Sequence, residues 1–95
     1  MYLSHQQVAA TAAVKDVDDL TVPAKATHAE LQADTSDIRY TMDNATDPTQ
    51  TSGMILLTTE DPMLFLIEDI YRIRFTRGSG SNGNLNVHYV AGRDI

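Results

Sequence analysis

The segment Gly78-Ser79-Gly80-Ser81-Asn82-Gly83 has the G-x-G-x-x-G spacing of a loop that binds a dinucleotide pyrophosphate. That chemistry needs a strand before the loop, a helix opening at it, and an acidic residue ~20 positions further on. Here alternating apolar residues predict another strand at Leu85–Val90, and the remaining chain is too short for the acidic position. We therefore predict a hairpin loop and no cofactor.

Acidic residues form three groups that suggest metal binding. A calcium loop starting at Asp16 would need an oxygen ligand at position 20 and Gly at position 21, where Leu20 and Thr21 stand. Two further pairs, Asp34 with Asp37 and Asp43 with Asp47, could ligate a cation from loops. Aspartate more often accepts hydrogen bonds from turn backbone, and this is our interpretation. We expect no metal site.

The histidines, His5, His28 and His88, are far apart in the sequence, and the last two fall on the polar positions of expected strands. We expect them on the surface. The chain has neither the G-x-S-x-G sequence of a serine nucleophile nor the H-E-x-x-H sequence of a zinc protease. Glu60, Asp61, Glu68 and Asp69 are typical of a charged rim. The prediction is that the protein is not an enzyme.

Charge is distributed unevenly along the chain. Four basic residues and one acidic residue lie from position 70 to 95, against three basic and twelve acidic residues before them. Arg72 and Arg74 would share one face of a strand, and Arg77 would follow at its end. Because a guanidinium pairs well with carboxylates, this strip could bind an acidic partner or a second copy of the chain. It could equally be a solvated face that discourages edge pairing.

Apolar residues alternate with polar ones along most of the chain, which predicts strands with one face buried and one face solvated. This pattern covers 27–34, 37–43, 71–77 and 84–90. Continuous apolar runs at 54–59 and 63–68 favour more deeply buried strands, and Leu20–Val22 reads as a short strand ended by Pro23. Turn residues separate these segments, and no gap is long enough for parallel strands joined by helices. The predicted fold is all-β, a small antiparallel β-sandwich or barrel over residues 20–95.

Residues 1–19 are ambiguous, because Ala9, Ala10, Ala12 and Ala13 favour a helix and the neighbouring Val and Thr residues favour a strand. Met1–Gln7 is either an extended N-terminal arm or part of an ordinary first strand. The N-terminal residues contain neither a basic nor an apolar signal region, so we expect no secretory signal.

Composition excludes several classes of partner. Of 95 residues, 13 are Asp or Glu and 7 are Lys or Arg, which gives a formal charge of −6. A net negative chain is unsuited to nucleic acid or to anionic lipid. The longest apolar run, Met63–Ile67, is far shorter than the ~20 residues that cross a bilayer. No cysteine is present, so disulfides and thiolate metal sites are excluded. A core this small favours assembly with other subunits, which adds buried surface.

Two resemblances support the β-sandwich prediction. One segment is similar to a corner of the immunoglobulin-like modules attached to bacterial glycosidases: Ile38-Arg39-Tyr40-Thr41-Met42-Asp43, then Thr46-Asp47-Pro48-Thr49, then Ser52-Gly53. The stretch from Leu20 to Ala91 resembles short virion proteins of tailed bacteriophages. Four segments carry that likeness: Val22-Pro23-Ala24-Lys25-Ala26 through Gln32, the Ile38-Arg39-Tyr40 strand with its Thr-x-Pro-Thr loop, Gly53-Met54-Ile55-Leu56, and the closing Ile73-Arg74-Phe75 with Leu85-Asn86-Val87. It implies a structural protein, with a capsid cement or decoration role the leading expectation.

We therefore expect a protein that binds the outer capsid shell and stabilises it by bridging subunits of the major capsid protein. It would be made in the host cytoplasm, and would self-associate, more plausibly as a trimer than as a dimer. The expected contact residues are Tyr2, Leu3, His5, Gln6, Gln7, Arg72, Arg74 and Arg77.

Two alternatives remain open. One is a head-completion or tail adaptor subunit. The other is a glycan-binding receptor module, which the absence of Trp disfavours, since such sites usually stack sugars on exposed aromatic rings.

Overall fold

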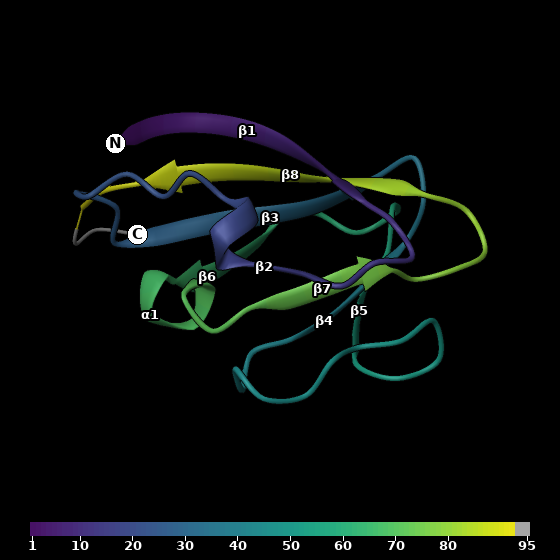
Figure 1. The fold of residues 1–95 in the computed structure, drawn as a ribbon. Coiled ribbons are helices and arrows are strands. Elements are labelled where there is room, and N and C mark those ends of the chain that lie inside the picture. The colour runs from purple at the N-terminus through teal and green to yellow at the C-terminus, as the bar shows by residue number, and fades with distance from the viewer. Residues whose placement is uncertain (93–95) are drawn as a thin grey trace.

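A computed structural model describes residues 1–92 and shows two antiparallel sheets of four strands each, arranged as two layers (Figure 1). The first sheet has the order β1 (Tyr2–Ala10), β8 (Gly83–Val90), β3 (His28–Asp34) and β6 (Met63–Leu66). The second has the order β2 (Lys15–Asp16), β7 (Arg74–Arg77), β4 (Ile38–Thr41) and β5 (Met54–Leu56). The predicted all-β class is confirmed, and because the sheets are separate the fold is a sandwich.

The core lies between the sheets and is formed by the apolar positions of the alternating strands. Along β8, Leu85, Val87 and Tyr89 are fully buried, and along β3, Leu31 is fully buried between Ala29 and Ala33. The second sheet contributes Ile38, Leu56 and Phe75, again without exposed surface beyond a few per cent. Burying each large apolar side chain contributes ~1.5–3 kcal/mol. The period-two pattern therefore determines which face of each strand is inside.

The N-terminal residues form the first strand of the sandwich. β1 pairs with β8 from Tyr2 to Ala10, and the chain end is fixed further, since the Met1 amino group donates to the Ala91 carbonyl over 2.9 Å. Leu3 and Val8 pack against the core. Of the two alternatives for Met1–Gln7, the strand is correct and the free arm is wrong, because β1 satisfies a backbone edge of β8. Residues 1–19 thus supply one strand to each sheet. At the other end of the expected 20–95 domain, positions 93–95 lie outside the described residues.

Two loops cross between the sheets and pack against each other. The Gly78–Gly83 segment joins β7 of the second sheet to β8 of the first, so the predicted hairpin is wrong, although strands flank it as expected. Its neighbour is the 35–37 loop between β3 and β4. A Cβ on Gly83 would meet the Ser36 carbonyl oxygen at 2.7 Å, and one on Gly78 would meet the Asp37 oxygen at 2.9 Å. These glycines are required for close backbone approach.

Local structure differs from the predicted strands in two places. Val17–Asp19 forms a 3₁₀ turn, η1, capped by Asp16, and Leu20–Val22 continues without strand pairing. Residues Ile67–Ile70 form a short helix, α1, so β7 begins only at Arg74. Ile70 and Ile73 are both buried and lie three positions apart, a spacing typical of one helix face. The same segment also contains the apolar–polar alternation of a strand, so its sequence is ambiguous. Among residues 1–92, no helix is long and apolar enough to span a membrane.

The two continuous apolar runs are less buried than predicted, because both form edge strands. In β6 only Phe65 packs against the core, whereas Leu64 and Leu66 are 45% and 52% exposed. In β5, Leu56 is buried and Met54 is largely exposed. These strands have apolar residues on both faces, so the outward ones are available for other contacts.

This assignment of faces predicts opposite effects for two leucines at neighbouring positions of the first sheet. Leu31→Ala should lower the free energy of unfolding by ~2–5 kcal/mol, because it leaves a cavity in the core. Leu64→Ala should change it by no more than ~0.5 kcal/mol, because Leu64 points outward. Urea denaturation measures both. Equal losses would contradict the register of β3 with β6.

Candidate interaction surface

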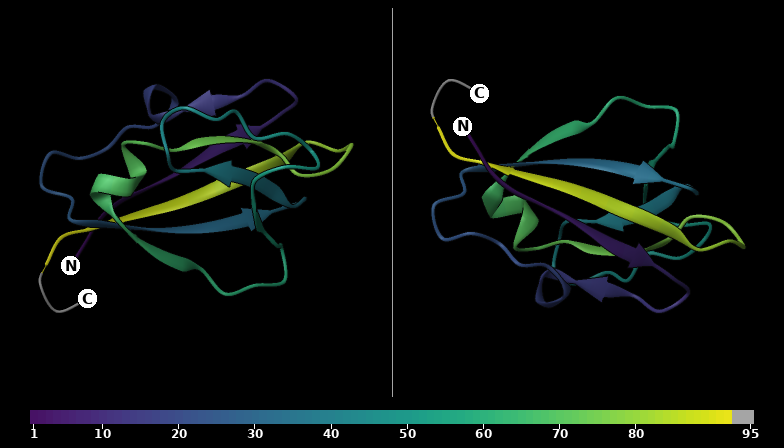
Figure 2. Two further views of the ribbon diagram at one scale, coloured as in Figure 1. Left: turned by 90° about the horizontal axis from the view of Figure 1, so that it is seen from below. Right: turned by 90° about the horizontal axis from the view of Figure 1, so that it is seen from above.

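Figure 2 (right) shows the strands of the first sheet side by side, and their register aligns the outward positions of the four strands in rows, three of which are described here. The central row follows from the register: His5 lies opposite His88, His88 opposite Glu30, and Glu30 opposite Leu64. On one side lies the row Tyr2, Val90, His28 and Leu66, and on the other the row Gln7, Asn86 and Gln32. We call these eleven residues the outer face.

Contacts between side chains organise the outer face. The Tyr2 hydroxyl donates to Glu30 Oε1 over 2.7 Å, and Gln7 Nε2 donates to Asn86 Oδ1 over 2.9 Å. The ring of His88 meets both His5 and Tyr2 edge-on, with centroids 4.8 Å and 5.3 Å away. The hydrogen bond to the Glu30 carboxylate, together with its charge, raises the pKa of Tyr2, since a phenolate could not donate and would be repelled.

The outer face combines exposed apolar groups with hydrogen-bonding groups and little charge. Tyr2 is 65% exposed, and with Leu64 and Leu66 it frames the polar centre. A hollow of about 100 Å³ lies beside the two histidines and is lined by His5, Glu30, Gln32, Pro62, Asn86 and His88. Among these eleven residues Glu30 is the only Asp or Glu, in a chain of net charge −6, and Asp34 lies one row beyond Gln32, opposite Asn84. Another surface could therefore approach it with little electrostatic opposition.

The structure divides the N-terminal residues that the sequence singled out. Tyr2, His5 and Gln7 point outward and belong to the outer face. Leu3 and Gln6 point inward: Leu3 packs against the core, and Gln6 Oε1 accepts hydrogen bonds from Tyr89 Oη and Thr21 N. Strand alternation explains this division. As a result, Leu3 and Gln6 have structural roles.

The predicted basic strip of Arg72, Arg74 and Arg77 does not exist as one face of one strand. Arg72 lies in the turn after α1, where its N–H donates to the Asp69 carbonyl. Arg77 donates from Nη1 to Asn82 Oδ1 over 3.0 Å. Arg74 and Arg77 are three residues apart on β7, so strand alternation separates them. The prediction failed because residues 71–73, which would have begun the strand, form the turn after α1.

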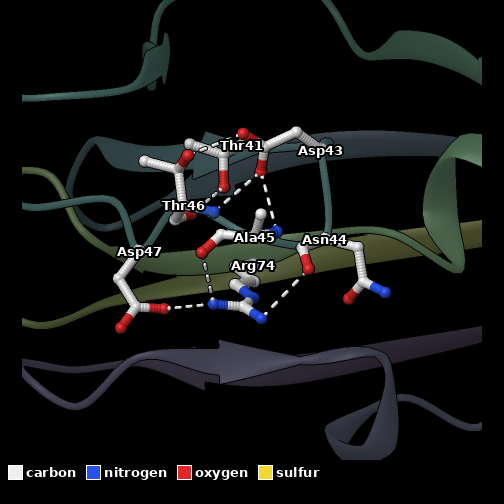
Figure 3. Close-up of polar contacts among 7 residues, drawn as sticks. All are labelled: Thr41, Asp43, Asn44, Ala45, Thr46, Asp47 and Arg74. Atoms are coloured by element: carbon white, nitrogen blue, oxygen red, sulfur yellow. Dashed lines mark hydrogen bonds and ion pairs between the residues drawn. The ribbon is translucent and has the colours of Figure 1, made fainter.

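Arg74 instead fixes the loop after β4 (Figure 3). Its guanidinium pairs with Asp47 Oδ1 over 2.8 Å and donates to the carbonyls of Asn44 and Ala45. Asn44 has a φ of 56°, a left-handed conformation in which Asn is better tolerated than most residues. Two carbonyls and one carboxylate thus satisfy Arg74 within the chain.

Asp43 caps the same loop. Its carboxylate accepts from Ala45 N, Thr46 N and Thr46 Oγ1, the last over 2.6 Å. These hydrogen bonds, led by the Thr46 hydroxyl, lower the pKa of Asp43 to about 2. The turn-capping interpretation is confirmed for Asp43, and Asp16 caps η1 in the same manner. Among residues 1–92, no three His, Asp or Glu side chains converge on a common point suited to a metal.

Comparison with protein-family models, curated proteins and solved structures gives no match for this chain.

Most of the outer face was not found from sequence. The sequence predicts Glu30, Asn86 and His88 at polar positions of separate strands, and Leu64 and Leu66 within a buried run. The sequence feature that pointed to this face is that His5, Glu30 and His88 occupy outward positions of strands. Only the order β1-β8-β3-β6 shows that these positions align.

The cap at Asp43 predicts a pH dependence of stability. The carboxylate has a lower pKa in the folded chain than the ordinary 3.8, so its stabilising contribution is present above about pH 4 and is lost as pH falls towards about 2. Melting temperatures measured from pH 5 to pH 2 should fall less steeply for Asp43→Asn than for the wild type. A carbon-detected NMR titration that gives Asp43 an ordinary pKa would contradict this.

Proposed function

We propose that the protein is a non-enzymatic structural subunit that binds another protein surface through the outer face of the first sheet. The observation that carries this proposal is the pattern of Tyr2, Leu64 and Leu66 around a weakly charged, hydrogen-bonded centre. A sheet face that served only solubility would carry mostly charged side chains. Protein contact surfaces combine aromatic and aliphatic groups with hydrogen-bonding groups and few charges.

The proposed setting is the capsid of a tailed bacteriophage, with the chain as a cement or decoration protein. The resemblance of Leu20–Ala91 to short virion proteins supports it, as does a small disulfide-free sandwich that gains stability from assembly. The proposed partners are the major capsid protein and further copies of the chain, as a trimer, after synthesis in the host cytoplasm. A head-completion or tail adaptor subunit would have the same features, and copy number per particle separates the two roles.

The size of the outer face indicates how such a subunit would act. Strands are ~4.8 Å apart and alternate residues ~6.8 Å apart, so four strands and three rows cover ~400 Å². A stable interface usually buries ~800 Å² on each partner. A single copy of the chain would therefore bind another protein only weakly through this face. Bridging two coat subunits, or joining copies in an oligomer, makes the second contact intramolecular and raises the overall affinity.

A specific observation favours a glycan-binding module as a second candidate. Tyr2 is an exposed aromatic ring on the same face as the amides of Gln7, Gln32 and Asn86, three groups that can donate to and accept from hydroxyls. The hollow beside His5 and His88 is small, about 100 Å³, which suits one sugar ring better than a chain. This candidate uses the same face with a different ligand.

The protein-binding proposal predicts that a charge on the outer face prevents incorporation into particles. Leu66→Lys should strongly reduce the amount of the chain in purified virions of the phage that encodes it, because lysine is depleted from interface cores. Met54→Lys is the matched control, since Met54 is also exposed but belongs to the second sheet. Circular dichroism establishes that both variants fold. Normal incorporation of Leu66→Lys would exclude this face as the contact.

The glycan candidate predicts saturable binding of the isolated chain on a glycan array. Tyr2→Ala should lower the affinity by at least ~10-fold if the ring stacks on a sugar, whereas Tyr71→Ala, an exposed tyrosine outside the outer face, should leave it unchanged. An array without any saturable signal would remove this candidate.

A further inference from the structure

His5 and His88 form a pair that the fold creates from the two ends of the sequence. They are directly opposite each other on β1 and β8, and their ring centroids are 4.8 Å apart. Both side chains are exposed, so both can rotate about χ1 and χ2 without disturbing the core. Two imidazole nitrogens that bind one metal ion at ~2.0–2.1 Å each place their rings at a comparable separation.

The ring nitrogens of this pair are available. Within residues 1–92, no hydrogen bond joins either ring to another group, and their contacts with each other and with Tyr2 are between ring edges and faces. The third histidine differs, because His28 Nδ1 lies 2.9 Å from Thr27 Oγ1. The hollow of about 100 Å³ beside His5 and His88 leaves space for an ion with its water ligands.

We propose that His5 and His88 chelate a borderline divalent cation such as Zn²⁺ or Ni²⁺. Imidazole is a preferred ligand of these ions, whereas Mg²⁺ and Ca²⁺ prefer oxygen. The pair supplies two ligands and water completes the shell, in keeping with the finding that no third His, Asp or Glu converges with them. Glu30 lies opposite His88 on β3, and its carboxylate accepts a hydrogen bond from the Tyr2 hydroxyl. It therefore adds negative charge beside the pair without being a ligand.

The chelate would act on the folded chain alone. His5 and His88 meet only when β1 pairs with β8, so the unfolded chain offers two separate, weaker sites. An ion that binds the native state preferentially stabilises it by linkage. Because β1 is an edge strand, held in the first sheet by β8 alone, the ion would join this strand to the centre of the sheet.

The test is a titration of the full chain with ZnCl₂ and NiCl₂, followed by calorimetry and by the melting temperature. We expect one saturable site and a rise in melting temperature of several degrees, with no response to MgCl₂ or CaCl₂. His5→Gln and His88→Gln should each weaken binding by at least ~10-fold and abolish the rise. His28→Gln is the matched control and should bind as the wild type does.

Three results would overturn the proposal. Binding that survives His5→Gln and His88→Gln, or that His28→Gln abolishes, would place the ion elsewhere. A wild-type chain without a saturable site at millimolar ZnCl₂ or NiCl₂ would show that the pair does not chelate. Because each variant changes an exposed side chain, its melting temperature without metal confirms that it folds.

Discussion

Strand β8 lies between β1 and β3, and its backbone hydrogen bonds hold both of them in the first sheet. The alternation of side chains along this strand is the constraint on which the rest of the structure depends. Leu85, Val87 and Tyr89 must be inside, which forces Asn86 and His88 outside. A slip of one residue would exchange the two sets. The core and the outer face are therefore specified by the same register.

The second sheet supports the first and supplies little to the outer face. Its charged groups are used internally: Arg74 fixes the loop after β4, and Arg39 Nη1 donates to the Gly53 carbonyl over 2.8 Å. The crossing loops meet through Gly78 and Gly83, where only glycine fits. The polar network of the second sheet thus stabilises loops, whereas that of the first sheet lies on an open surface. This difference is why we assign binding to the first sheet.

Strand alternation made the fold class, β3, β4 and β8 predictable from sequence, because local pattern and burial agree there. It failed where a helical and a strand pattern overlap, as at Ile70 and Ile73, and where edge strands carry apolar residues on both faces, as at Leu64 and Leu66. The outer face was predictable only in part. Tyr2, His5 and Gln7 lie on it, but Glu30 and His88 join them only through strand order, which depends on long-range pairing that no local pattern encodes. The arginine strip was predicted wrongly because residues 71–73 form a turn, and the partners of Arg74 lie in the distant loop after β4.

The central claim is that the outer face of the first sheet is the surface that becomes covered on assembly. Hydroxyl-radical footprinting of the free chain and of the chain in assembled particles measures this directly, side chain by side chain. The account predicts that Tyr2, Leu64 and Leu66 become protected on assembly, while Met54 and Tyr71 react as before. Protection of Met54 or Tyr71 with unchanged reactivity of Tyr2 and Leu66 would contradict it.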